Sequence, residues 1–252
     1  MSILSITPLF RCLYAAATLA ATAPGGAPQP SPTVPTAAPV KSTAKTSPAP
    51  AKDDANVWAG KVQKAYEGVK DFSARFEQDV TVKGASAAPS TGTIAVQKPG
   101  KMRWEFETPE KKSFVSDGKT MWMYEASENQ VIVNENMAAT TSVTALNFLE
   151  GFGKLREEFA VSLATPRKNA ADPSAAFLSL RPKDEADVQF TEIVLGIDRK
   201  TSLAAEVWLV DSLGNETHLV FKDRKVNPKL DPKTFVFEIP KGAEVIRPTL
   251  LQ

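Results

Sequence analysis

The chain of 252 residues is short of cysteine, of histidine and of net charge. Cys12 is its one cysteine, so no internal disulfide can form, and no cluster of residues has metal-ligand spacing. The 30 basic and 29 acidic side chains leave a net charge of +1, which argues against nucleic acid because phosphate binding needs a basic excess. We therefore expect no metal, no cofactor and no nucleic-acid partner.

Catalytic groups are equally scarce. The one histidine, His218, lies in the strand-like run ETHLV, which favours a solvent-facing strand position over the role of a catalytic base. The neighbouring carboxylates of Glu157 and Glu158 fall on the charged face of an expected helix, with nothing nearby to tune them for proton transfer. An enzyme is the less favoured alternative, and we expect a protein that is not an enzyme and has no catalytic residue.

Long hydrophobic runs are missing as well. Residues 13–23 form an apolar run that is too short to span a bilayer but suits the core of a signal peptide. We expect residues 1–23 to be a signal peptide, and an uncleaved N-terminal anchor is the alternative. Lipidation of Cys12 is not expected, because Phe10 and Arg11 precede it where small residues would be needed.

Residues 24–52 contain eight prolines and no aromatic residue. Such a segment cannot bury enough apolar surface to offset the entropy lost on ordering, so we expect a disordered linker. It serves either as a tether or as a leader with no role of its own. The folded domain is then expected to cover residues 53–252.

The domain should begin with one amphipathic helix. Asp53 and Asp54 are cap-type residues, and Trp58, Val62 and Tyr66 recur at helical spacing. After this helix, which should end near residues 68–71, the period of the pattern changes to two. Strands are expected at 72–83, 93–97, 102–107, 113–116, 120–124, 131–134, 177–181, 190–198, 204–211, 216–223 and 235–237.

The strand at 102–107 shows the alternation most clearly. Met102, Trp104 and Phe106 should face one side, and the charged residues between them the other. With Phe114, Met121, Trp122, Met123 and Tyr124 nearby, this region indicates a surface suited to an apolar ligand.

The strands are interrupted by residues 138–159, which predict one or two short helices with a glycine hinge. These helices are either a movable cover over the sheet or ordinary core helices. One helix, many antiparallel strands and this insertion predict an α+β fold, a strongly curved antiparallel sheet or incomplete barrel with helices filling its open side.

Several blocks between about residues 57 and 247 carry a resemblance to one known family. They are FSARFEQ at 72–78, KP at 98–99, RW at 103–104, TP at 108–109 and VSDGKT at 115–120, followed by Trp122 and Tyr124. In these blocks and in their order the chain resembles the periplasmic outer-membrane lipoprotein carrier family, LolA.

The resemblance implies an unclosed half β-barrel with an N-terminal helix and a helical lid on the concave side. It implies a monomeric periplasmic carrier that binds the acyl chains of lipoproteins. Its partners would be acylated lipoproteins, an inner-membrane lipoprotein-releasing ABC transporter and an outer-membrane acceptor. The alternative function is a membrane-attached acceptor, or an envelope stress-sensing lipid-binding module of the same fold.

The resemblance and the alternation together suggest the ligand-binding residues. Each of them is alternatively an ordinary core residue. The family often has an arginine before the proline of the first turn, where it helps the lid to close, and here Lys98 stands in that place. Lysine lacks the planar fork of arginine, so lid closure should be weaker or differently arranged. The wall residues are Met102, Trp104 and Phe106, and the lid residues are Leu146, Phe148 and Leu149.

Overall fold

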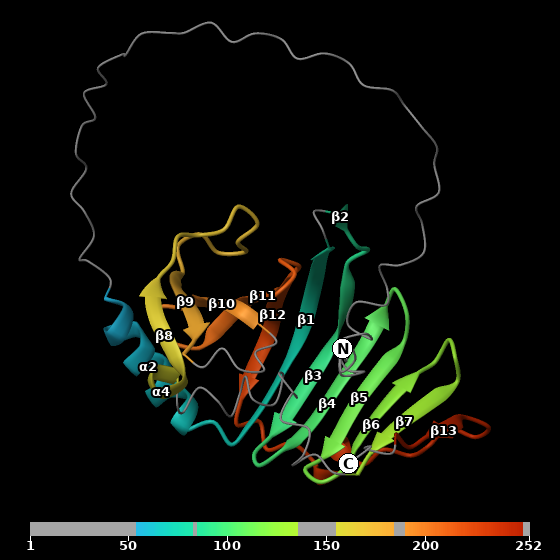
Figure 1. The fold of residues 1–252 in the computed structure, drawn as a ribbon. Helices are drawn as coiled ribbons and strands as arrows, with labels where there is room; N and C mark the ends of the chain where they lie inside the picture. The colour runs from blue at the N-terminus through green and yellow to red at the C-terminus, as the bar shows by residue number, and fades with distance from the viewer. Residues whose placement is uncertain (1–53, 83–84, 136–154, 184–189, 249–252) are drawn as a thin grey trace, which may run out of the picture.

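The computed structural model shows one long, curved sheet that does not close on itself (Figure 1). Helix α2 (Ala55–Glu67) lies beside one end of the sheet, where it contacts the last two strands, β9 and β8. The expected α+β fold with an unclosed, curved antiparallel sheet and an N-terminal helix is thus confirmed. The structure describes residues 54–82, 85–135, 155–183 and 190–248.

Some expectations lie outside these ranges. The signal peptide at residues 1–23, the linker at residues 24–52 and the lid residues Leu146, Phe148 and Leu149 are not among the described residues, so they stay predictions. Of the helices in the described ranges, none combines the length and hydropathy needed to cross a bilayer.

Helix α2 begins and ends where the sequence indicates. The Asp54 carboxylate caps it by accepting hydrogen bonds from the backbone N–H groups of Asn56 (2.8 Å) and Val57 (3.1 Å). Gly68 follows the last turn, and its N–H is bonded to the Tyr66 carbonyl. The residues that the helix buries recur at helical intervals: Trp58, Ala59, Val62 and Tyr66.

The first half of the sheet is a series of antiparallel hairpins. The central strand, β1 (Asp71–Val82), pairs with β3 on one side and with β12 on the other, and joins the two halves. Turns at residues 98–100 and 118–120 connect β3 to β4 and β5 to β6. The strands of this half are β1, β2 (Ala85–Ser86), β3 (Ser90–Gln97), β4 (Lys101–Thr108), β5 (Lys112–Asp117), β6 (Met121–Glu125) and β7 (Gln130–Asn134).

The second half continues on the other side of β1. Its strands run antiparallel in the order β12, β11, β10, β9, β8, and the short helix α4 (Leu155–Glu158) leads into β8. The last strand, β13, does not belong to this half: it pairs with β7 in the parallel sense, at the outer edge of the first half. The remaining strands are β8 (Phe159–Leu163), β9 (Ala176–Pro182), β10 (Phe190–Ile197), β11 (Ala204–Asp211), β12 (Glu216–Val226) and β13 (Glu244–Ile246); β2, β8 and β13 had not been expected from the sequence.

One expected strand is absent. The expectation of a strand at 235–237 is wrong, because residues Pro232–Phe235 form the 3₁₀ turn η4. The Asp231 carboxylate caps this turn by accepting from the Lys233 N–H at 2.9 Å, and Pro232 suits its first position. Phe235 is buried beneath the turn, against the convex face of the sheet rather than in a ladder of strands.

The main core lies on the concave face of the sheet. Successive side chains of a strand point to opposite faces, so alternate residues of most strands enter this core; β2 and β13 contribute none. Trp58 and Val62 of α2 join the same cluster as Leu178, Leu195 and Ile197 of the second half. The helix therefore covers apolar surface that the open sheet cannot cover by closing on itself.

Tyr66 ties the helix to both halves of the sheet. Its phenol oxygen accepts a hydrogen bond from the backbone N–H of Ala204 (3.2 Å), and its carbonyl accepts one from Lys98 Nζ (3.1 Å). Burial raises the pKa of Tyr66 to about 12, although the Ala204 N–H and the Arg224 charge act in the opposite direction.

This pKa makes stability depend on alkaline pH. The contribution is fully present below pH 10, the unfolded pKa, and is lost as the pH rises towards 12, because only the unfolded chain ionises in that window. We expect the free energy of unfolding to fall by up to ~1.4 kcal/mol per pH unit between these values. Urea unfolding at pH 9 and pH 11 measures the fall.

The Tyr66→Phe variant should lose this part of the pH dependence, and the Tyr124→Phe variant should keep it. An equal fall in both variants would contradict the assignment to Tyr66.

Candidate functional site

The concave face of β4 carries the three expected wall residues. Met102 and Trp104 are buried, with 1% and 8% of their surface exposed, and Phe106 is partly buried against the same cluster. The expectation that these three side chains share one face is confirmed, and Arg103 and Glu105 lie on the other face. That they bind a ligand stays a prediction.

An aromatic patch, defined as Phe76, Trp104, Phe106 and Phe114, forms the centre of this wall. The Phe76 ring meets Trp104 and Phe106 edge-on, with centroids 5.2 and 5.0 Å apart. The Trp104 and Phe106 rings are stacked at 6.1 Å, and Phe114 meets Phe106 edge-on at 5.9 Å. Three strands, β1, β4 and β5, thus present one continuous aromatic surface.

Gly92 of β3 makes this patch possible, and sequence reasoning missed its role. In the strand register it lies between Phe76 and Phe106. A Cβ atom on Gly92 would lie 2.8 Å from a ring carbon of Phe76 and 1.9 Å from the Glu105 carbonyl oxygen. Glycine inside a strand pattern is the signal that could have indicated this close approach.

The wall continues into a small recess over β5, β6 and β7. Its cavity volume is only about 10 Å³, far below that of pockets for drug-sized ligands. Phe114, Met123 and Ile132 form its apolar lining, and Lys112 and Glu125 contribute polar groups. Because Phe114 belongs to the aromatic patch as well, the recess and the patch form one apolar surface.

Lys112 is the buried cation of this region. Burial by itself would lower its pKa, but hydrogen bonds and charges of Glu125 and then Glu110 outweigh that effect, so the pKa of Lys112 is raised. Its Nζ lies 2.7 Å from Glu125 and 3.3 Å from Glu110. Lys112 is therefore a paired cation at neutral pH.

Lys98, the expected lid-closure residue, follows β3, and its side chain reaches the C-terminal end of helix α2. Its Nζ donates to the Tyr66 carbonyl, where a positive charge also stabilises the negative end of the helix dipole. The lid residues that it was expected to help close lie outside the described ranges, so its part in closure stays a prediction.

Trp122 and Tyr124 do not belong to the concave wall. They lie on the convex face, where Phe237 stacks on Trp122 at 6.0 Å and lies 6.3 Å from Tyr124. Arg103 holds the same tail, because Nε donates to the Thr234 carbonyl (2.6 Å) and Nη2 to the Val236 carbonyl (2.7 Å). The expected apolar surface of this region is therefore divided between two faces.

His218 is not solvent-facing, so that expectation is wrong. Its side chain is 4% exposed, and the Trp208 ring stacks on it at 4.2 Å. The reason is the loop at residues 164–175, which covers the convex face of β9 to β12 and buries a second, smaller core there.

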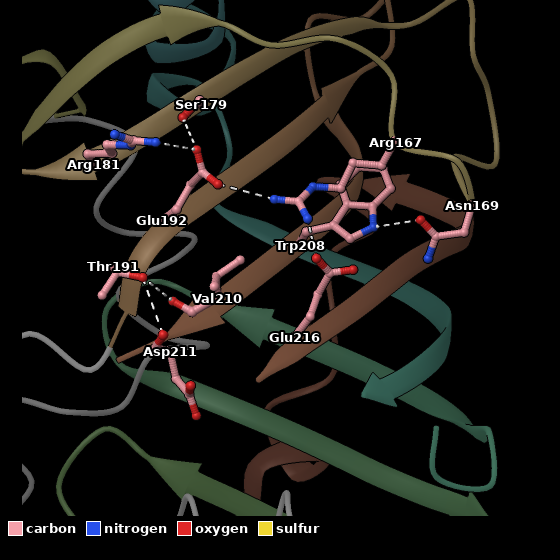
Figure 2. Close-up of polar contacts among 10 residues, drawn as sticks. All are labelled: Arg167, Asn169, Ser179, Arg181, Thr191, Glu192, Trp208, Val210, Asp211 and Glu216. Carbon is pink, nitrogen blue, oxygen red and sulfur yellow. Dashed lines mark hydrogen bonds and ion pairs between the residues drawn. The ribbon is translucent and has the colours of Figure 1, made fainter. Parts of the chain in front are cut away.

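Hydrogen bonds assign the roles of the His218 nitrogens. The Trp208 indole can only donate, so it donates to Asn169 Oδ1 (3.3 Å), as Figure 2 shows. The Asn169 amide then donates to His218 Nδ1 (3.2 Å), and Nε2 donates to Glu206 (3.1 Å). Glu206, which is fully buried, also accepts from the backbone N–H of Ala171 at 2.8 Å.

A second polar cluster holds the same loop. Arg167 is paired with Glu192 at 3.2 Å and with Glu216, and Glu192 accepts from Ser179 at 2.6 Å (Figure 2). Every group in these two clusters has a partner within the protein, and the pattern is that of a structural layer. We interpret His218 as a residue that fixes the loop at residues 164–175.

The fold and the concave wall define a class, that of open half-barrels with an apolar inner face. In the described part of the chain, no group of three or more histidine, cysteine, aspartate or glutamate side chains is arranged to hold a metal ion. Residues 67–238 match the family described as outer membrane lipoprotein carrier protein LolA. The chain belongs to this family, as the resemblance of its sequence blocks had indicated.

The relatives agree with this assignment. The outer-membrane lipoprotein carrier protein of Chromobacterium violaceum is 33% identical over 198 residues, which cover 79% of this chain and 90% of the relative. That of Legionella pneumophila strain Corby is 32% identical over 187 residues, covering 74% and 88%. Among solved structures, a LolA superfamily protein from Nitrosomonas europaea covers 74% of this chain and is itself covered to 99%, at 12% identity and a TM-score of 0.41.

Gly92→Ala tests how the wall is built. We expect it to lower the free energy of unfolding by about 2–3 kcal/mol, because the added Cβ meets backbone and ring atoms that must move apart. Urea unfolding followed by near-ultraviolet circular dichroism would report both stability and the packing of the aromatic patch.

Gly60→Ala is the matched control. Gly60 lies in helix α2 with open space around its Cα, so the same methyl group should stabilise the protein by ~0.5–1 kcal/mol. If Gly92→Ala were as stable as the wild type, packing of the aromatic patch would not depend on the absence of a side chain at residue 92.

Proposed function

We propose that this protein is a periplasmic carrier that binds the acyl chains of lipoproteins released from the inner membrane and delivers them to the outer membrane. The observation that carries the proposal is the aromatic patch on the inner face of an unclosed sheet. Membership of the LolA family and the names of the relatives support it. An open sheet suits this task because its inner face can be uncovered without breaking a closed ring of strands.

We assign the acyl chains to the concave wall formed by Met102, Trp104 and Phe106. The lid is assigned to Leu146, Phe148 and Leu149, and Lys98 to its closure. The aromatic patch and the apolar recess beside it support the wall assignment, because together they form a surface of rings and thioethers on one face of the sheet.

The energetics of acyl transfer explain why the interior should be only a partial shelter. Burying a methylene group contributes ~0.8 kcal/mol, so a fully sheltered 16-carbon chain would contribute about 12 kcal/mol. Free diffusion of such a chain through water is prohibitive, and a carrier that sheltered it completely would not release it. In this structure the described interior is filled by its own side chains, which a bound chain would have to displace. That displacement weakens net binding and favours release.

The proposed partners follow from the route. An inner-membrane lipoprotein-releasing ABC transporter would supply the acylated lipoprotein, and an outer-membrane acceptor would receive it. The protein would act as a monomer, with one cargo on one wall. No covalent step is required, because transfer changes only the surroundings of the acyl chains, and we propose no enzymatic activity.

A release assay tests the carrier function. The purified protein is added to spheroplasts that make a labelled triacylated lipoprotein, and the soluble fraction is probed for a one-to-one complex. We expect wild-type protein to release the lipoprotein and Trp104→Glu to lose at least about 90% of this release, because an unpaired carboxylate on the wall opposes acyl binding.

Thr93→Glu is the control, since Thr93 is exposed on the convex face of the neighbouring strand and gains the same charge. It should release lipoprotein as the wild type does. Failure of a folded wild-type protein to release any lipoprotein would contradict the carrier function and favour the acceptor or stress-sensing module. The mass of the native N-terminus would then distinguish a tethered from a free protein.

A further inference from the structure

Two buried polar atoms stand out on the concave face. Within the described ranges, Gln78 Oε1 and Trp104 Nε1 are buried side-chain atoms without a hydrogen-bond partner. Their residues are only 2% and 8% exposed. A buried polar atom without a partner costs free energy, so most such atoms in folded proteins are paired, and an exception calls for an explanation.

Other buried polar groups of the same face are paired. Ser116 donates to the Gly100 carbonyl at 2.8 Å and accepts from the Gly118 N–H at 3.1 Å. Lys112 is paired with two carboxylates. The two unpaired atoms are therefore a local feature of the wall and not a general property of the interior.

One of these atoms lies in the aromatic patch, and the other lies on the same face next to it. Gln78 follows Phe76 by two residues on β1, so the two side chains share the concave face. Trp104 contacts Phe76 directly. In the register Trp104 is level with Ala74, four residues before Gln78, which corresponds to roughly 13 Å along the strand. One ligand atom could not satisfy both, but two polar groups of one extended ligand could.

Water is a poor partner for the Trp104 indole. A buried water molecule needs two to four polar partners. The rings of Phe76 and Phe106 pack on the indole, and Ile94 and Phe114 are its cross-strand neighbours. These groups are apolar, so a partner for the indole N–H has to arrive as part of something that is itself largely apolar.

We propose that Trp104 Nε1–H donates a hydrogen bond to a carbonyl oxygen of the bound acyl cargo, at the ester or amide that joins an acyl chain to its carrier molecule. The Gln78 amide, which can both donate and accept, pairs with a second polar group of the same cargo, farther along the wall. This proposal rests on the proposed function and adds to it a preference for one kind of ligand over another. The wall recognises an acyl group rather than a bare hydrocarbon chain, because a site with a buried donor disfavours a ligand that leaves the donor unpaired.

Two synthetic lipopeptides test the proposal on the purified full-length protein. Both carry a cysteine with an S-linked glyceryl group and two chains of equal length, joined by ester bonds in one lipopeptide and by ether bonds in the other. The ether compound keeps the linking oxygen and lacks the carbonyl. We expect the wild-type protein to bind the ester compound three- to tenfold more tightly, the range of one net hydrogen bond.

Variants assign the preference to residues. Trp104→Phe and Gln78→Leu should each reduce the ester-to-ether ratio of Kd values towards one. Trp122→Phe makes the same change on the convex face, where Trp122 stacks on Phe237, and should keep the ratio of the wild type.

A direct readout avoids dependence on how the variants fold. The indole N–H resonance of Trp104, identified in the wild-type protein by ¹⁵N labelling, should move downfield with the ester compound and less with the ether compound. Equal Kd values for the two compounds with an unmoved indole resonance would overturn this inference and leave the carrier function standing. Failure to bind either compound would overturn both.

Discussion

The alternation of side chains along β1 is the constraint on which the rest of the structure depends. Among the described strands, β1 is the one that pairs with both halves of the sheet, with β3 on one edge and β12 on the other (Figure 1). Phe72, Phe76 and Gln78 are buried, and Arg75 and Glu77 between them are exposed. A slip of one residue in its pairing would turn Phe76 away from the aromatic patch and expose Arg75 or Glu77 to the core, so burial fixes the register of β1 with both of its neighbours.

The two faces of the sheet meet different needs. On the concave face the neighbouring strands bring Phe76, Trp104 and Phe106 together, and Gly92 between them leaves room for the rings. On the convex face the chain covers itself, with the tail held by Arg103 over β4 to β6 and the loop at residues 164–175 over β9 to β12. The convex face is thus covered over β4 to β6 and over β9 to β12, which supports the proposed assignment of the ligand to the concave wall.

Much of this structure could be predicted from the sequence, and some of it could not. The cap at Asp54, the hairpin turns and the face shared by Met102, Trp104 and Phe106 could be predicted, since capping and alternation act within a few residues. The positions of Trp122, Tyr124 and His218 could not, because their surroundings come from segments far away in the chain. Phe237 covers the first two, and the third is enclosed by Asn169, 49 residues away in the covering loop, together with Trp208 of the neighbouring strand.

Local physical chemistry in the sequence by itself determined where helix α2 begins, which residues alternate in each strand and which family the blocks resemble. Only the tertiary structure decided which apolar face became the inner wall and which was covered by the chain's own tail. It also decided that the indole N–H of Trp104 has no partner among the described residues. The physical reason is that alternation along a strand shows only that its two faces differ in polarity. Which face is covered, and by what, depends on contacts between residues far apart in the sequence, such as Arg103 with Val236.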